Sequence, residues 1–185
     1  MNIQDAVEIM YKNDGSLPDI EFDFGLEKCV DTAYQIIQQH STHIVTVNPY
    51  YWSNSRDVDI PIIFGQNPAE MFLSGEAQSF QLVFGGIKSP SGKSIPDLGV
   101  CVLMENTISL DYRMGEDWNA EAVEGLFEIM SLLKSISSTT TIKHTGNYFD
   151  SEEILIAVFN NWLVGRQHEK KKLNCQSFTA NIDIG

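Results

Sequence analysis

Histidines and cysteines are the side chains in this sequence that most often catalyse reactions or hold metals, and their spacing matches no established motif. The four histidines form no HExxH pattern, and none has a cysteine at the close spacing of a zinc site. The sequence also lacks the GxSxG and SxxK nucleophile motifs. We therefore expect no metal, no cofactor and no local catalytic motif.

Two segments have the composition of ligand-binding loops but the wrong spacing. Five residues separate Gly86 from Gly92 where a P-loop has four, and Pro96 opposes the helix that should follow. The alternating acids of residues 19–23 resemble the start of a calcium loop, but the required glycine and closing glutamate are absent. We interpret the first segment as a solvated turn and the second as the wet face of a strand.

The charge of the chain points to a basic protein partner. Its 185 residues carry 25 acids against 12 Lys and Arg, a formal net charge of −13. Residues 1–31 hold eight acids against two lysines, and residues 105–128 hold seven against one arginine. Such a surface repels phosphate backbones and anionic lipid, so direct nucleic-acid binding and membrane binding are disfavoured. Electrostatic steering of a basic protein is favoured instead.

Cysteine usage indicates a reducing compartment, and we expect a cytoplasmic protein. Three widely spaced cysteines do not make a disulfide framework. The first residues carry acids and no continuous apolar stretch, which argues against a signal peptide, and no run approaches the roughly 20 apolar residues of a membrane span. We expect Cys29, on the apolar side of a helix, and Cys101, inside an apolar strand, to be small core residues.

Hydrophobic periodicity predicts helices interspersed with strands. Apolar residues three and four apart predict helices over 3–11 and 26–40, a short helix from Asn67, a long one from about Asn119, and one capped at Asp150. Alternating or β-branched runs predict strands over 18–24, 43–47, 58–64, 80–84, 98–104, 107–112 and 140–145, with a weak edge strand over 178–184. This order predicts a single α+β domain over residues 1–185, with a mainly antiparallel sheet packed against several amphipathic helices.

The helical stripes also predict which side chains are buried. Tyr11 and Leu26 are expected on the apolar sides of the first two helices. Glu121, Glu124 and Glu128 are expected on the wet face of the long helix.

Acids and aromatic residues together predict a binding surface for a protein. Tyr50, Tyr51 and Trp52 lie in a loop-like context near acids, a composition typical of interface hot spots, although covering one end of the core is an equally good interpretation. Strand alternation turns the acids of residues 19–23 outward and places those of residues 57–59 opposite their apolar neighbours. The predicted partner-binding residues are Tyr50, Tyr51, Trp52, Asp57, Asp59, Asp19, Glu21, Asp23, Glu116 and Asp117.

The stretch Ile108–Trp118, with the sequence ISLDYRMGEDW and an amphipathic helix after it, resembles segments of cytoplasmic immunity proteins of bacterial toxin systems. The resemblance implies a non-enzymatic inhibitor that binds a cognate toxin, often a basic nuclease, and blocks its active site. It covers a short part of the chain and transfers no individual site residue.

Two alternative functions remain open at this stage. A viral anti-defence or DNA-mimic protein would present acids at phosphate-like spacing to a nucleic-acid enzyme. A small enzyme would assemble a site from residues distant in sequence, for instance His40, His43 and His144. The sequence indicates no oligomeric state.

Overall fold

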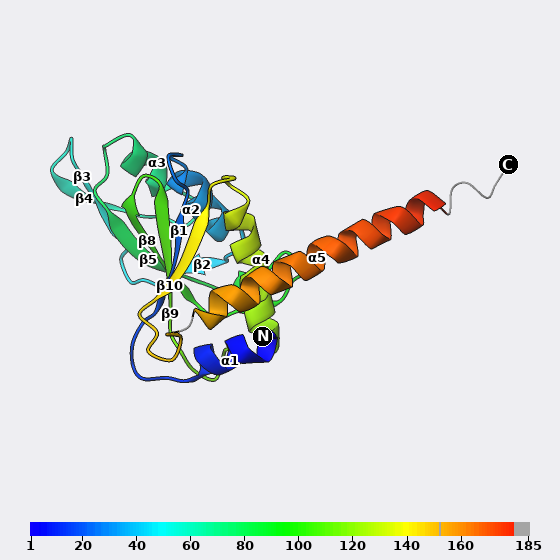
Figure 1. The fold of residues 1–185 in the computed structure, drawn as a ribbon. Helices are drawn as coiled ribbons and strands as arrows, with labels where there is room; N and C mark the ends of the chain where they lie inside the picture. The colour runs from blue at the N-terminus through cyan, green and yellow to red at the C-terminus, as the bar shows by residue number, and fades with distance from the viewer. Residues whose placement is uncertain (152, 180–185) are drawn as a thin grey trace.

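A six-stranded antiparallel sheet forms the centre of the molecule (Figure 1). The computed structural model describes residues 1–151 and 153–179 of the chain. Across the sheet the strands are β10 (Thr141–Thr145), β1 (Asp19–Asp23), β9 (Thr107–Tyr112), β8 (Leu98–Met104), β5 (Phe80–Gly85) and β2 (His43–Ile44). The predicted α+β class with a mainly antiparallel sheet is confirmed.

Alternating residues of the strands build the core on one face of the sheet. Ile20 and Phe22 of β1, Leu110 of β9, Val100 of β8 and Leu82 of β5 are all buried there. Their neighbours along each strand point to the opposite face, because successive side chains of a strand alternate. The helices pack against the buried face and complete one continuous hydrophobic core.

The described residues form five helices, and asparagine side chains cap the first turn of three of them, Asn2 included. They are α1 (Ile3–Tyr11), α2 (Val30–Gln39), α3 (Pro68–Leu73), α4 (Ala120–Lys134) and α5 (Ile154–Thr179). The side chain of Asn119 accepts a hydrogen bond from the N–H of Ala122 at 3.0 Å, and that of Asn67 accepts one from Ala69 at 3.2 Å. Both predicted helix starts are confirmed. Within the described residues, no helix is long and apolar enough to cross a membrane.

Two small ribbons project from the sheet. Strands β3 (Tyr50–Ser53) and β4 (Val58–Pro61) form a hairpin. Strand β6 (Ile87–Lys88) pairs with β7 (Ser94–Ile95), and residues 89–93 form the turn between them. The β3–β4 hairpin and α3 lie at one end of the molecule, and α1, α4 and α5 lie toward the other (Figure 1).

Several predicted boundaries and burials are wrong. The second helix begins at Val30, so Leu26 lies in the preceding turn and is fully exposed. Tyr11, the last residue of α1, is also exposed. Strand β2 is limited to two residues. Helix α5 continues through Thr179, which rules out a strand at residues 178–179, and the remainder of that predicted strand lies outside the described residues.

Glu128, expected on the wet face of the long helix, is 3% exposed. The turn between β6 and β7 packs on α4 and covers it: the N–H and hydroxyl of Ser91 both donate to its carboxylate at 2.9 Å. Helical periodicity cannot reveal this, because the covering turn is distant in sequence.

Candidate protein-binding surface

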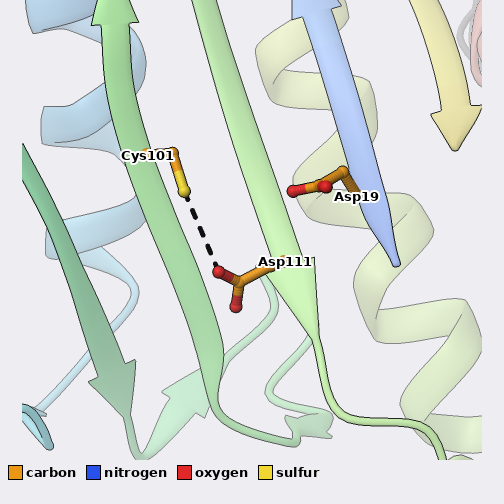
Figure 2. A group of neighbouring side chains, drawn as sticks. All are labelled: Asp19, Cys101 and Asp111. Atoms are coloured by element: carbon orange, nitrogen blue, oxygen red, sulfur yellow. Dashed lines mark hydrogen bonds between the residues drawn. The ribbon is translucent and has the colours of Figure 1, made fainter. Parts of the chain in front are cut away.

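The face of the sheet opposite the helices, called the open face below, carries the acids of β1. Asp19, Glu21 and Asp23 are half-buried there, which confirms their predicted outward direction, while their role in binding stays a prediction. Asp111 of β9 and Cys101 of β8 lie on the same face. Figure 2 shows Asp19, Asp111 and Cys101 on the side of the strands turned away from the helices.

The open face places two carboxylates directly opposite each other. In the antiparallel pairing of β1 with β9, Asp19 is the partner of Asp111. Burial raises the pKa of Asp19, and the negative charges of Asp111 and Glu21 raise it further. Like charges at directly opposed positions destabilise a sheet. The fold therefore carries a cost at this position.

Neighbouring residues are fitted to the Asp111 carboxylate. Gly99, its partner on β8, leaves the necessary space, because a Cβ atom there would lie 1.9 Å from Oδ1 of Asp111. The side-chain amide of Gln81 on β5 donates a hydrogen bond to Oδ2 of Asp111. Gly99 of β8 and Gln81 of β5 therefore both favour this position of the Asp111 carboxylate on the open face.

Cys101 lies on the open face, so the expectation of a core cysteine is wrong in its placement. Its thiol donates to Oδ2 of Asp111 at 3.8 Å. Burial, together with the charges of Asp111 and Asp19, raises the pKa of Cys101 to about 12. The ligand atoms of Asp19, Cys101 and Asp111 lie within 4.8 Å of one another, which is where a cation would be held. The protonated thiol opposes that use, since metals bind the thiolate.

An open groove of about 760 Å³ lies at one end of the open face. Asp97, Asp111 and Asp117 contribute carboxylates to it and Arg113 a cation, while Val45, Val83, Ile95 and Met114 supply apolar walls. Asp117 therefore shares a surface with the β1 acids through Asp111. Glu116, the neighbouring predicted residue, is exposed and is not among the residues that line this groove.

A second groove, of about 640 Å³, lies between the β3–β4 hairpin and β5. Tyr50, Trp52 and Asp59 line it, as does Gln81, whose amide reaches Asp111 on the open face. Gln81 and Asp111 therefore connect the two grooves, and Asp19 of β1 lies directly opposite Asp111.

All three aromatic residues of the run line the second groove. Tyr51, which alternates with Tyr50 and Trp52 along β3, also packs against the core. The packing of Tyr51 agrees with the core-covering interpretation, and the role of the run as a binding hot spot stays a prediction. Asp57 lies in the hairpin turn with a φ of 57° and is not among the groove-lining residues, although Asp59 is.

The histidines do not assemble into one site. His43 is on β2 and His144 is on β10, at opposite edges of the sheet. The Nδ1 atom of His40 lies 2.8 Å from the carbonyl oxygen of Lys88, an ordinary loop contact. The enzyme alternative built on His40, His43 and His144 is therefore not supported by their positions.

A buried chain of polar groups links the end of β10 to α5. Nδ1 of His144 lies 2.5 Å from Oδ2 of Asp150, and its Nε2 lies 2.8 Å from the hydroxyl of Tyr112. Asp150 also accepts the N–H of Ile154 at 2.6 Å. Helix α5 begins at Ile154, three residues later than a cap at Asp150 implies. Tyr112 is 1% exposed, and burial raises its pKa, so this hydroxyl does not reach a substrate. We assign these hydrogen-bonded side chains of Tyr112, His144 and Asp150 a structural role.

The residues of the surface that sequence reasoning missed include Gln81, Asp97 and Asp111. Asp111 was detectable, because it alternates with Leu110 and Tyr112 in a predicted strand. Gln81 alternates with Phe80 and Leu82 in the same way, whereas Asp97, in the turn before β8, carries no such signal. Their place depends on the register of β5 and β8 and on the turn that precedes β8.

Comparison with known proteins gives one distant structural similarity. No protein-family model matches the chain, and no curated protein matches it. One chain of the 1.75 Å crystal structure of the toxic C-terminal tip of CdiA from Pseudomonas aeruginosa, in complex with its immune protein, is similar to it. That similarity has a TM-score of 0.46 at 14% identity, over 74% of this chain and 90% of the other. At this distance it carries no conclusion about fold or function.

Proposed function

We propose that this chain is a non-enzymatic inhibitor of the immunity-protein type, which binds a basic toxin domain on its open face. The opposed carboxylates of Asp19 and Asp111 carry this proposal. They cost stability, and Gly99 and Gln81 favour the observed position of Asp111. A cationic partner would relieve their repulsion on binding.

The segment that resembles immunity proteins supplies part of the same surface. Within Ile108–Trp118, the residues Asp111, Arg113, Met114 and Asp117 line the groove of about 760 Å³. A nuclease toxin is cationic where it holds the phosphate backbone. Acids grouped beside an apolar wall are suited to covering such a surface.

The DNA-mimic alternative has weaker support. Asp19, Glu21 and Asp23 form a row with two-residue spacing along β1, roughly 7 Å from one to the next. Lys143 on β10 stands directly across from Glu21 and interrupts the negative field beside the row. A mimic would favour a longer unbroken stripe of acids. The genes beside this one separate the two functions, since an immunity gene adjoins a toxin gene and a mimic lies among viral genes.

The proposal is tested with the product of the adjoining gene as the partner. We expect co-expression of this chain to protect bacterial cells from that product, and the two purified proteins to bind at equal stoichiometry. The Asp19→Asn/Glu21→Gln variant should bind at least about tenfold more weakly at low salt, because charge pairs across an interface are lost.

The matched control is Glu8→Gln/Glu121→Gln, which removes the same charge from exposed positions on α1 and α4. It should bind like the unmodified protein. Equal weakening by both variants, or binding that is insensitive to salt, would contradict docking on the open face. Undiminished toxicity in the presence of the chain would overturn the inhibitor function itself.

A further inference from the structure

The hairpin groove combines aromatic faces with a single carboxylate. In the β3–β4 pairing Trp52 is the direct partner of Asp59, so both side chains lie on the same face of the hairpin. Tyr50, two residues before Trp52, shares this face. Among the described residues that line the groove, Asp59 alone is charged. An aromatic ring beside a carboxylate is the arrangement that holds an organic cation.

The groove side of the hairpin is held in place from behind. Ser53, on the opposite face, is fully buried, and its hydroxyl and that of Ser55 both donate to the carboxylate of Glu76. The N–H of Asn54 donates to the carbonyl of Glu76 at 2.7 Å, and the N–H of Gln78 donates to the carbonyl of Trp52 at 3.0 Å. These bonds tie β3 to the segment after α3. The aromatic groove is thus organised before any partner arrives.

Two side-chain amides add acceptors to the groove. The amide nitrogen of Gln81 donates to Asp111, and that of Gln78 donates to Asn54 at 3.3 Å. Their carbonyl oxygens are what remains to accept hydrogen bonds. A ligand with several donors in one plane matches two amide oxygens and one carboxylate better than a point charge does.

We propose that this groove binds an arginine side chain of the partner protein, with the guanidinium stacked on Trp52 and paired with Asp59. The inference rests on the proposed function, because it assigns the chemistry that the partner brings to this surface. Arginine is favoured over lysine, since its planar group stacks on aromatic rings and donates in two directions at once. The volume of about 640 Å³ has room for the whole side chain. Gln81 joins the groove to Asp111, so this arginine would enter beside the acids of the open face.

The test follows the indole N–H signals of the tryptophans in a two-dimensional NMR spectrum of the full chain. The probe is the blocked peptide acetyl-Gly-Arg-Gly-amide, compared with the same peptide containing citrulline, which keeps the shape without the charge. We expect the Trp52 signal to shift with saturation at millimolar peptide, and the citrulline peptide to bind roughly tenfold more weakly. Trp118, whose indole is buried and donates to the carbonyl of Arg113, is an internal control.

A pair of hairpin variants completes the test. Asp59→Asn should weaken the binding of the arginine peptide roughly tenfold. Asp57→Asn removes the same charge two residues away, in the turn, and should leave binding unchanged. The inference is overturned if Trp52 does not respond to the arginine peptide, if citrulline binds as well, or if the two variants behave alike. Any of these results with partner binding intact leaves the inhibitor function standing without this groove.

Discussion

Asp19 faces Asp111 across two hydrogen-bonded strands, and its replacement by Asn keeps the shape while removing the repulsion. We expect Asp19→Asn to raise the free energy of unfolding at pH 7 by up to about 1 kcal/mol, measured by urea denaturation. Burial and the charge of Asp111 raise the pKa of Asp19, so its ionised form is less favourable in the folded chain. The gain should therefore be absent below the ordinary value of 3.8, develop as the pH rises through the raised pKa, and persist above it.

The control for this stability change is Asp23→Asn. Asp23 lies on the same strand and face, but its partners across the strands are Thr107 and Thr141. Asp23→Asn should therefore raise the free energy of unfolding by less than Asp19→Asn does. If Asp19→Asn instead lowers stability, the pair is not repulsive. A gain in stability together with weaker partner binding would be the signature of acids kept for function.

Alternation within single strands predicted the direction of these acids but not their pairing. The sequence Asp19–Asp23 shows which side chains share a face, because that depends on neighbouring residues alone. That Asp111 lies opposite Asp19 depends on the register of β1 against β9, which joins residues far apart in the chain. The Gln81–Asp111 hydrogen bond could not be predicted either, because it also joins residues far apart in the chain.

Glu128 of α4 links the turn between β6 and β7 to helix α5 through hydrogen bonds and ion pairs. Besides both donors of Ser91, it accepts from Lys93 at 3.3 Å and pairs with Arg166 at 3.1 Å. Burial alone would raise the pKa of Glu128, but the hydrogen bonds of Ser91 and Lys93 outweigh it and lower the value to about 2. The contribution to stability should be complete above about pH 4.5 and be lost as the pH falls through about 2.

We expect Glu128→Gln to lower the free energy of unfolding by about 3 kcal/mol at pH 7. This figure follows from the difference between the ordinary glutamate pKa of 4.5 and the lowered pKa of about 2. Urea denaturation at a series of pH values should show the difference between variant and unmodified protein shrinking as the pH falls from 4.5 toward 2. Glu124→Gln, on the same helix, removes a half-exposed carboxylate that pairs with Lys93 and should cost less than about 1 kcal/mol. A pH-independent loss in Glu128→Gln would mean that packing, not charge, is what Glu128 supplies.

At the scale of whole elements, the predictions succeeded where local pattern decides and failed where packing between distant segments decides. The strands at residues 98–104 and 107–112 and the start of α4 at Asn119 follow from alternation and capping. The placement of the hairpin beside β5, which creates the aromatic groove, follows from tertiary contacts of Glu76 and Gln78. The candidate surface was therefore predicted as a set of acids and aromatics, and its shape was not.

The net charge of −13 acts at the scale of the whole molecule, on the rate at which a basic partner arrives. In stopped-flow measurements with the partner, Asp19→Asn/Glu21→Gln should slow association about tenfold at low salt and flatten its salt dependence. Trp52→Ala, which removes an aromatic face from the hairpin groove, should instead speed dissociation, with a loss of about 2 kcal/mol or more for a hot spot. The two effects separate because long-range charge acts before contact and packing acts after it. If Trp52→Ala slows association while the acid variant speeds dissociation, the roles of the groove and the open face are reversed.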